Sequence, residues 1–319
     1  MKAIRFYQNR KTYLIISAVV MVIGIIGILI NGVSLDIQFK GGAILKYNCE
    51  TEVDVNKLES VVSDFLNRPV SAQLTSDLAT GSQRVVLNLA GEQGLDAAVQ
   101  EELEAVMNEA IPDARLTLSE SMVVEPFLGR TFLVKGIIAL ALSAILIILY
   151  VWVRFRKIGG LSAGLMAVLA LAHDVIVVFI TCVLFKIPLG DSFVAVALSI
   201  IGFSVNDTIV VYDRIRENER TIKGPLEDLV NVSITQSLTR SLNTSVAVFL
   251  SVTIVYVLAF AKDIGSVQAF ALPMAIGTIS GCYSTVCIAG PFWVVLKKRQ
   301  EEKKAHISAP KGKNATAKS

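Results

Sequence analysis

The sequence predicts an α-helical membrane protein with six transmembrane helices and an α+β domain inserted between the first and second helix. Three observations lead to this fold class. Of the 319 residues, 53% are hydrophobic and only 18% are charged, whereas soluble domains carry about 25% charged residues. Six apolar runs approach or exceed the ~20 residues that a helix needs to cross a bilayer. A polar stretch of mixed charge, residues 31–130, separates the first run from the other five.

The first apolar run, residues 14–30, is predicted to be a transmembrane helix that stays in the protein. The preceding segment 1–13 is basic, and a basic segment before an apolar run is also typical of a signal peptide. No Ala-x-Ala-like cleavage site follows the run, however, and further apolar runs come later in the chain. We therefore expect an uncleaved first helix.

The polar region 31–130 is predicted to form one small folded domain outside the cytoplasm. Apolar residues recur at helical spacing in two segments and with strand-like patterns in four others. These elements are expected at 43–47, 53–67, 69–78, 84–89, 94–110 and 116–124. The order strand, helix, strand, strand, helix, strand is that of a ferredoxin-like domain.

Residues 131–296 are predicted to hold the other five transmembrane helices, near 132–153, 161–185, 192–212, 242–261 and 267–296. The last run is long and contains Pro273, so we expect it to tilt or kink. Small residues are expected to allow close approach of helices, at Gly159, Gly160, Gly164, Gly277 and Gly281.

Two segments near the predicted membrane surface are assigned from their composition. Apolar residues recur at spacings of three and four over 215–238, which predicts an amphipathic helix on the cytoplasmic surface. The alternatives there are an extension of the fifth helix or a packed core helix. The tail 297–319 is basic and then polar without an apolar stripe, which predicts disorder.

The distribution of basic residues predicts the orientation. Most of the 30 Lys and Arg residues lie in four segments, 1–13, 154–160, 213–238 and 297–319, whereas the two short loops on the other side hold only Lys186 and Lys262. Basic residues favour the cytoplasmic side. We therefore expect a multi-pass protein of the cytoplasmic (inner) membrane, with both termini in the cytoplasm.

Three of the predicted helices carry ionisable side chains. The third contains His173 and Asp174, and the fourth contains Asn206 and Asp207. A carboxylate at bilayer depth costs at least ~2.5–3.5 kcal/mol and marks a functional site by default. The start of the fifth helix is polar and includes Thr239. On a helix, one polar face is formed by Gln236, Arg240, Asn243 and Thr244. Lipid does not tolerate such a face, so we expect it to point into the bundle.

Asp207 and Arg240 are predicted to lie at similar depth, because the fourth helix runs inward and the fifth runs outward. Burial favours the neutral carboxylic acid and a nearby guanidinium favours the carboxylate. Movement of Arg240 would therefore switch Asp207 between holding and releasing a proton. Asp174 is expected nearer the middle of the bilayer, which suits a proton path. The alternatives are a structural ion pair, an Arg240 that extends to the interface, and a packing role for His173.

Four segments of this sequence resemble the SecF family of protein-export membrane proteins: residues 36–42, 172–174, 202–218 and 237–245. The resemblance implies one half of a resistance–nodulation–division type transporter, with a SecD subunit supplying six more helices. It implies association with the SecYEG channel and use of the proton-motive force. In that family the carboxylate and guanidinium that match Asp207 and Arg240 are the proton-linked residues. Ser241 and Asn243 depart from the residues that are more frequent there.

The predicted function is a SecF-like translocase subunit, which draws unfolded secretory polypeptides across the membrane. It is expected to act without enzymatic chemistry, cofactor or metal, because no phosphate-binding loop, metal-spaced cluster or nucleophile triad is found and His173 and His306 are the only histidines. Membrane lipid is an expected partner and nucleic acid is not. The alternatives are a proton-driven small-molecule exporter of the same superfamily and a membrane assembly factor without transport.

Overall fold

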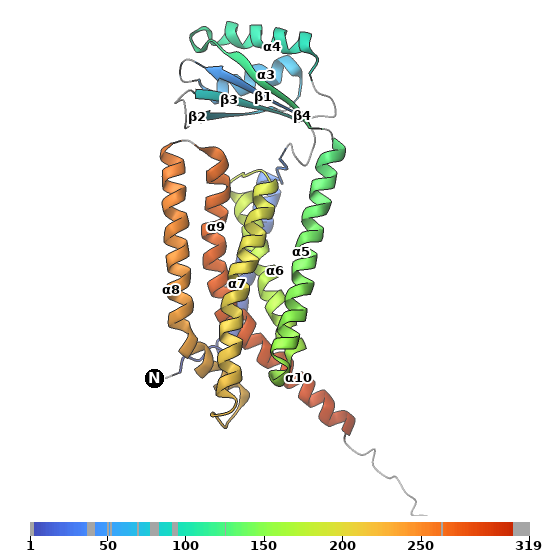
Figure 1. Ribbon diagram of the computed structural model, residues 1–319, viewed down its shortest axis with the longest axis vertical. Coiled ribbons are helices and arrows are strands. Elements are labelled where there is room, and N and C mark those ends of the chain that lie inside the picture. Colours follow the sequence, from blue (N-terminus) through green and yellow to red (C-terminus); the bar gives the residue numbers. More distant parts are fainter. Residues whose placement is uncertain are drawn as a thin grey trace, which may run out of the picture.

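Six long helices form a bundle, and a small sheet with two helices lies at one end of it (Figure 1). This computed structural model describes residues 3–36, 42–49, 51, 53–68, 70–76, 83–90, 95–124, 126–262 and 264–308. Within these ranges, six helices are long and apolar enough to cross a membrane. The predicted class, a mostly helical membrane protein with six spans and a small sheet domain, is confirmed in this respect. Most of the predicted segment 36–42 lies outside the described residues.

The sheet domain contains four antiparallel strands in the order β2-β3-β1-β4. Its elements follow the chain as β1 (Gly42–Cys49), α3 (Val55–Leu66), β2 (Val70–Ser76), β3 (Gln83–Ala90), α4 (Ala97–Ala110), the short helix η1 (Pro112–Ala114) and β4 (Thr117–Val124). Every second residue of β1 points into one core, where it meets Leu58 of α3 and Leu103 of α4. Because α3 and α4 cover the face away from the bundle, the other face of the sheet looks toward the membrane helices (Figure 1).

Tyr47 lies at the centre of this core, fully buried, and its hydroxyl has no hydrogen-bond partner among the described residues. Burial, with the charge of Glu104 as a second cause, raises the pKa of Tyr47 above its ordinary value of 10.0. In the unfolded chain the phenol ionises near its ordinary value, whereas in the folded domain it stays neutral. Folding stability should therefore fall as the pH rises above about 10.

We expect Tyr47→Phe to remove this alkaline loss of stability. At neutral pH the variant should be as stable as the parent or about 1 kcal/mol more stable, because it buries no unsatisfied hydroxyl. Denaturant unfolding of the full-length protein in detergent, followed by near-ultraviolet circular dichroism at neutral and alkaline pH, measures both effects. Burial also raises the pKa of the Cys49 thiol, so Cys49→Ala is the matched control for titration of a second core group. Equal alkaline losses in the parent and Tyr47→Phe would contradict the expectation.

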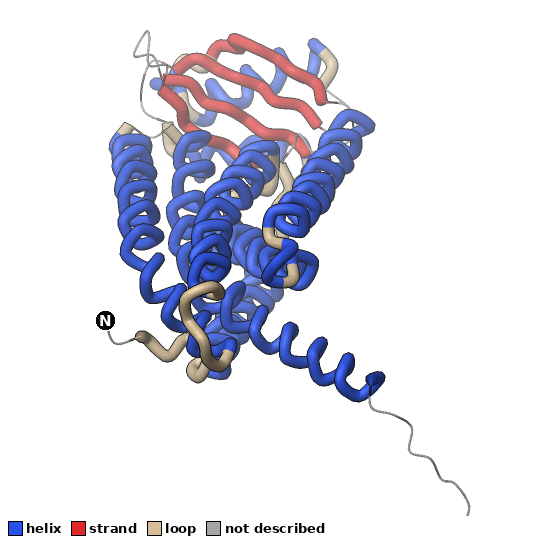
Figure 2. The backbone as a smooth tube through the Cα atoms, turned by 60° about the horizontal axis from the view of Figure 1, so that its bottom comes forward, coloured by secondary structure: helices blue, strands red, loops and turns tan. Residues whose placement is uncertain are grey.

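The helices of the bundle are α1 (Arg10–Asn31), α5 (Pro126–Arg154), α6 (Gly160–Leu184), α7 (Asp191–Asn218), α8 (Leu226–Ala261), α9 (Gly265–Ser284) and α10 (Gly290–Ser308). A short 3-10 turn, η2 (Arg156–Ile158), joins α5 to α6, and a π-helical turn, η3 (Thr285–Ala289), joins α9 to α10. The chain begins, and α10 ends, away from the sheet domain (Figures 1 and 2). The most buried spans are α6, α7 and the continuous α9–α10 helix.

The last span bends at η3, where α10 turns away from α9 (Figure 1). Pro273 lies inside α9 without ending it. A π-helical turn inside a helix is a common cause of such a kink.

Residues 215–238 do not form a separate surface helix, which corrects that prediction. Helix α7 continues to Asn218, and α8 starts at Leu226 and runs unbroken into the membrane span. Val230 and Ile234 are fully buried in a core that also holds Trp293 of α10. The periodic apolar residues therefore pack inside the protein, as in the alternative of an extended fifth helix.

The predicted disorder of 297–319 is also corrected in part. Helix α10 extends to Ser308, and residues 309–319 lie outside the described residues. Lys298 forms an ion pair of 2.8 Å with Glu227 at the start of α8, and the Lys297 ammonium lies 5.0 Å from the centre of the Trp293 ring. These contacts hold basic residues of the tail against the bundle.

Candidate functional site

Asp207 is buried between three helices of the bundle, with 2% of its surface exposed. One of its carboxylate oxygens, Oδ2, has no hydrogen-bond partner among the described residues. Ser241 and Ser245 of α8 face it, and Cys282 of α9 interacts with it electrostatically. The hydroxyls of both serines are also buried without a partner in the described part of the chain. Because unsatisfied buried polar atoms are rare and costly, this group is a candidate functional site.

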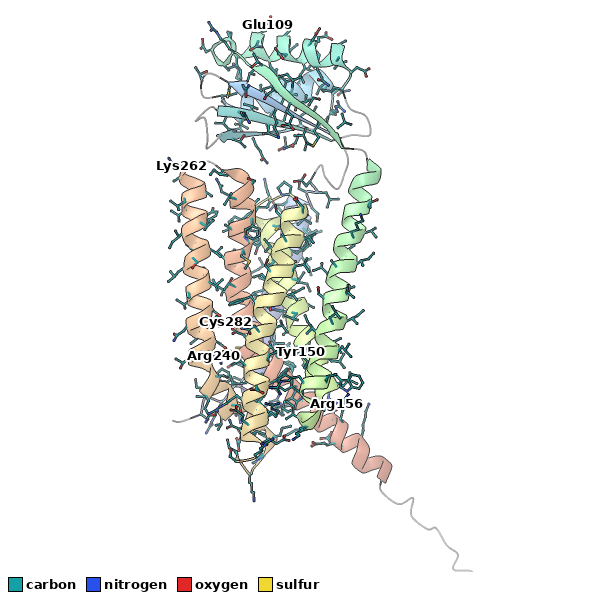
Figure 3. All side chains as sticks on the ribbon, in the orientation of Figure 1. Glu109, Tyr150, Arg156, Arg240, Lys262 and Cys282 are labelled. Atoms are coloured by element: carbon teal, nitrogen blue, oxygen red, sulfur yellow. The ribbon has the colours of Figure 1, made fainter. Side chains whose placement is uncertain are left out.

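Arg240 acts on Asp207 electrostatically, but the two side chains are not joined by any ion pair formed between described residues. A direct contact between them, which the sequence leaves open, is therefore not formed in this structure. Successive residues of an α-helix point about 100° apart. Since Ser241 is buried toward Asp207, the preceding residue, Arg240, points to the edge of the bundle and is exposed (Figure 3).

The polar face of α8 that was expected to point into the bundle lies mainly on its surface. Its members Gln236, Arg240 and Asn243 are exposed and Thr244 is half-buried; the neighbouring Thr239 is exposed as well. The face that does point inward consists of serines four residues apart, Ser233, Ser237, Ser241 and Ser245. Their small side chains allow α8 to approach its neighbours closely. The four-residue spacing of these serines is the sequence signal that could have identified the inward face of α8.

A surface groove of about 490 Å³ begins beside Arg240 and runs between α5, α7 and α8. Asn206, predicted as a supporting polar residue, is exposed and lines it together with Tyr150 of α5. Figure 3 shows Arg240 and Tyr150 in the half of the bundle farther from the sheet. Arg154 and Asp213 also line the groove and form an ion pair of 3.0 Å, and Asp213 binds Arg216 at 2.6 Å as well. The groove therefore joins the level of Asp207 to the charged end of the bundle.

Asp174 of α6 forms a second polar cluster, and its side chain is fully buried. Its Oδ2 accepts hydrogen bonds from Ser204 of α7 at 2.8 Å and from Ser284 of α9 at 2.7 Å, and its Oδ1 accepts one from Ser280 at 2.6 Å. His173 lies beside it, with Nδ1 3.4 Å from Oδ1. The serines were not predicted, although the four-residue spacing of Ser280 and Ser284 is a usable signal.

The structure thus places ionisable groups in two separate clusters inside the bundle, one around Asp207 and one around Asp174. Both carboxylates are surrounded by hydroxyl groups that can donate or accept hydrogen bonds. Among the described residues, no group of three or more His, Cys, Asp or Glu side chains is arranged to hold a metal ion.

Comparison with known proteins identifies the family. The model of the family described as "Protein export membrane protein SecD/SecF, C-terminal" matches residues 103–299, well over half of the chain. The protein translocase subunit SecF of Thermobaculum terrenum is 31% identical over 87% of this chain and 89% of its own length. That of Calditerrivibrio nitroreducens is 30% identical over 92% of this chain and 94% of its own length.

Solved structures agree with this result. The crystal structure of SecDF from Thermus thermophilus, described as a translocon-associated membrane protein, matches 93% of this chain with a TM-score of 0.74 and 26% identity. This chain spans only 39% of that SecDF chain. A SecDF structure in a super-membrane-facing form matches with a TM-score of 0.61. The sequence and structural matches together show that this chain belongs to the SecD/SecF family of protein-export membrane proteins.

Proposed function

We propose that this chain is the SecF-like subunit of a protein translocase in the cytoplasmic membrane. Together with a SecD-like subunit and the SecYEG channel, it couples the proton-motive force to the export of unfolded polypeptides. In this proposal both termini are cytoplasmic, and the sheet domain is a ferredoxin-like domain on the outer side, where exported polypeptide emerges. Asp207 and Arg240 are the coupling residues.

One observation carries the proposal: the carboxylate of Asp207, buried and with Oδ2 unpartnered among the described residues, lies next to a polar surface that lipid cannot cover. Charged and amide side chains within a membrane span face protein or water, because hydrocarbon leaves them unsolvated. Arg240, Asn243 and Asn206 are all exposed on this surface. A partner that covers the groove between α5 and α8 would enclose them and complete the site around Asp207.

The exposed side of α7 supports a helical partner. Four residues at spacings of four, three and four are exposed along it, namely Ala195, Ser199, Gly202 and Asn206. A Cβ atom placed on Gly202 would meet no atom within 4 Å. Such stripes of small residues are typical of close helix–helix packing in membranes. The SecDF chain, of which this chain spans 39%, is long enough to contain a second half of this kind.

The coupling step follows from the placement of Arg240 one residue before Ser241. A rotation of α8 about its axis would bring the guanidinium toward Asp207 and favour the carboxylate, and the reverse rotation would favour the neutral acid. Helix α8 leads directly into α9, whose first residue, Gly265, lies close to Gln73 of β2 in the sheet domain. Movement of the α8–α9 pair would thus reach the outer domain.

Site-specific photo-crosslinking tests the predicted partner. A photoreactive residue in place of Asn243, on the polar face of α8, should form an adduct with a SecD-like protein in intact membranes. The matched control replaces Val257, an exposed apolar residue of the same helix, and should react with lipid. An adduct of Asn243 with a second copy of this chain would instead favour a homo-oligomeric exporter and contradict the proposal.

A further inference from the structure

We propose that Asp174 and His173 form a second proton-binding site, separate from Asp207 and Arg240. The use of this site in transport rests on the proposed function, but its ability to bind a proton does not. The argument starts from the charge of a carboxyl group that is fully buried. Such a charge is costly unless a cation or several hydrogen-bond donors compensate it.

Around Asp174 the structure provides donors but no permanent cation. Three serine hydroxyls contact the carboxylate at 2.6–2.8 Å. Among described residues, the one basic side chain within 4.0 Å is His173, which is charged only when protonated. The pair therefore holds one proton, either on the carboxyl or on the imidazole, or loses it and relies on the three serines.

The other ionisable groups near the pair do not replace the missing cation. On α9, the Tyr283 ring lies 5.8 Å from the His173 ring, and Tyr13 of α1 packs against Tyr283 at 6.5 Å. Cys282 of α9, Cys287 of η3 and Asp207 of α7 are further ionisable groups on elements packed against α6. Each of these groups is neutral when protonated and negative when ionised. A bound proton is therefore the positive charge that the site can acquire.

A proton suits this cluster better than a metal cation does. The serine oxygens are in direct hydrogen-bond contact with the carboxylate, so a cation between them would have to push the helices apart. Ser284 has a second acceptor, the carbonyl of Gly281 at 3.2 Å. When Asp174 becomes protonated, this serine can turn its hydroxyl to that carbonyl and accept the new proton's hydrogen bond. The site can thus change its protonation state without moving the backbone.

The pair lies between the Asp207 cluster and the surface of the bundle. Ser204 precedes Asp207 by three residues on α7, so Asp174 lies about 4.5 Å closer to the sheet domain than Asp207 along the helix axis. The hydroxyl of Thr208, one turn past Ser204, is hydrogen-bonded to the hydroxyl of Thr285 at 3.0 Å. Hydroxyl groups therefore extend from Asp174 to the level of Asp207. On the other side, His173 lines a groove of about 290 Å³ at the surface of the bundle. A proton bound here is placed between that surface and the Asp207 cluster.

Infrared difference spectroscopy of the full-length protein in lipid nanodiscs tests the inference. Acid-minus-alkaline spectra should contain the carbonyl band of a protonated, buried carboxylic acid. Asp174→Asn should remove one such band, and Asp207→Asn should leave it in place. Ser280→Ala keeps the carboxyl group but removes its shortest hydrogen bond, so the same band should persist at a shifted frequency.

Two results would overturn the inference. One is an Asp174→Asn spectrum with every carboxyl band of the parent. The other is a band that Ser280→Ala leaves at its original frequency, because that carboxyl would not be the one bonded to Ser280. Failure of the proposed function would look different, since export would then be independent of the proton gradient while the Asp174 band remained.

His173→Gln should alter the pH at which the band appears, which a purely structural histidine would not do.

Discussion

Replacement of Asp207 by Asn is expected to abolish the part of export that depends on the proton gradient, while the protein still folds and assembles. The amide has nearly the same shape as the carboxylic acid, so the packing among α7, α8 and α9 should persist. It cannot bind or release a proton at physiological pH, and the interaction with Arg240 loses its charge on one side. Export of a secretory precursor in membrane vesicles, with and without a proton gradient, measures the effect.

The chain offers a matched control for this replacement. Asp191 lies at the start of the same helix and is exposed, so Asp191→Asn should leave gradient-dependent export close to the parent level. Arg240→Leu should act like Asp207→Asn, and the double variant should be no worse than either single variant if the residues work as one unit. Normal gradient-dependent export by Asp207→Asn would defeat the mechanism.

The spans and the sheet domain were predictable because they depend on local properties of the sequence. Mean hydropathy over about twenty residues decides whether a helix can cross the membrane. The alternation of apolar residues in β1 and the helical spacing in α3 likewise reflect burial of one face. The segment 215–238 was misassigned for a related reason. Periodicity shows that a helix buries one face but not what covers it, and here the cover is Trp293, far away in the sequence.

The candidate site was predictable in its residues but not in its contacts. Asp207, Asp174 and Arg240 stand out because ionisable groups are rare in apolar runs. Which faces of two helices meet depends on the rotation of each helix, and a single residue step changes that direction by about 100°. In the structure Ser241 is buried and faces inward, whereas Arg240 is exposed. Serines are easily overlooked because their small hydroxyls carry little signal in composition or hydropathy.

Gly160→Ala is expected to destabilise the bundle more than the other glycine replacements considered, because it places an atom against backbone. A Cβ atom on Gly160 would collide with the carbonyl oxygen of Trp152 and would lie 2.9 Å from the Trp152 Cα atom. The Trp152 backbone belongs to α5 and cannot turn away as a side chain can, so α5 and α6 must separate. Overpacking of this kind costs about 1–3 kcal/mol and sometimes more.

Two further glycines make this prediction graded and testable. At Gly164, one turn along α6, the Cβ atom would lie 3.2 Å from the Ile148 carbonyl oxygen, so Gly164→Ala should cost less. Gly202→Ala meets no atom within 4 Å and should stabilise the isolated chain by roughly 0.5–1 kcal/mol, because alanine favours helix over glycine. Thermal unfolding in detergent should rank the variants in this order.

The cause of the effect can be separated from loss of the nearby indole. Trp152→Ala removes the indole but keeps the backbone carbonyl that a Cβ atom on Gly160 would meet. Gly160→Ala should therefore cost the same stability in the Trp152→Ala background as it does in the parent protein. Rescue by Trp152→Ala, or equal stability of Gly160→Ala and Gly202→Ala, would show that α5 and α6 are not in backbone contact at this point. The predicted result would instead establish that the glycines of α6 set the distance between these two helices, and with it one wall of the groove that leads to Asp207.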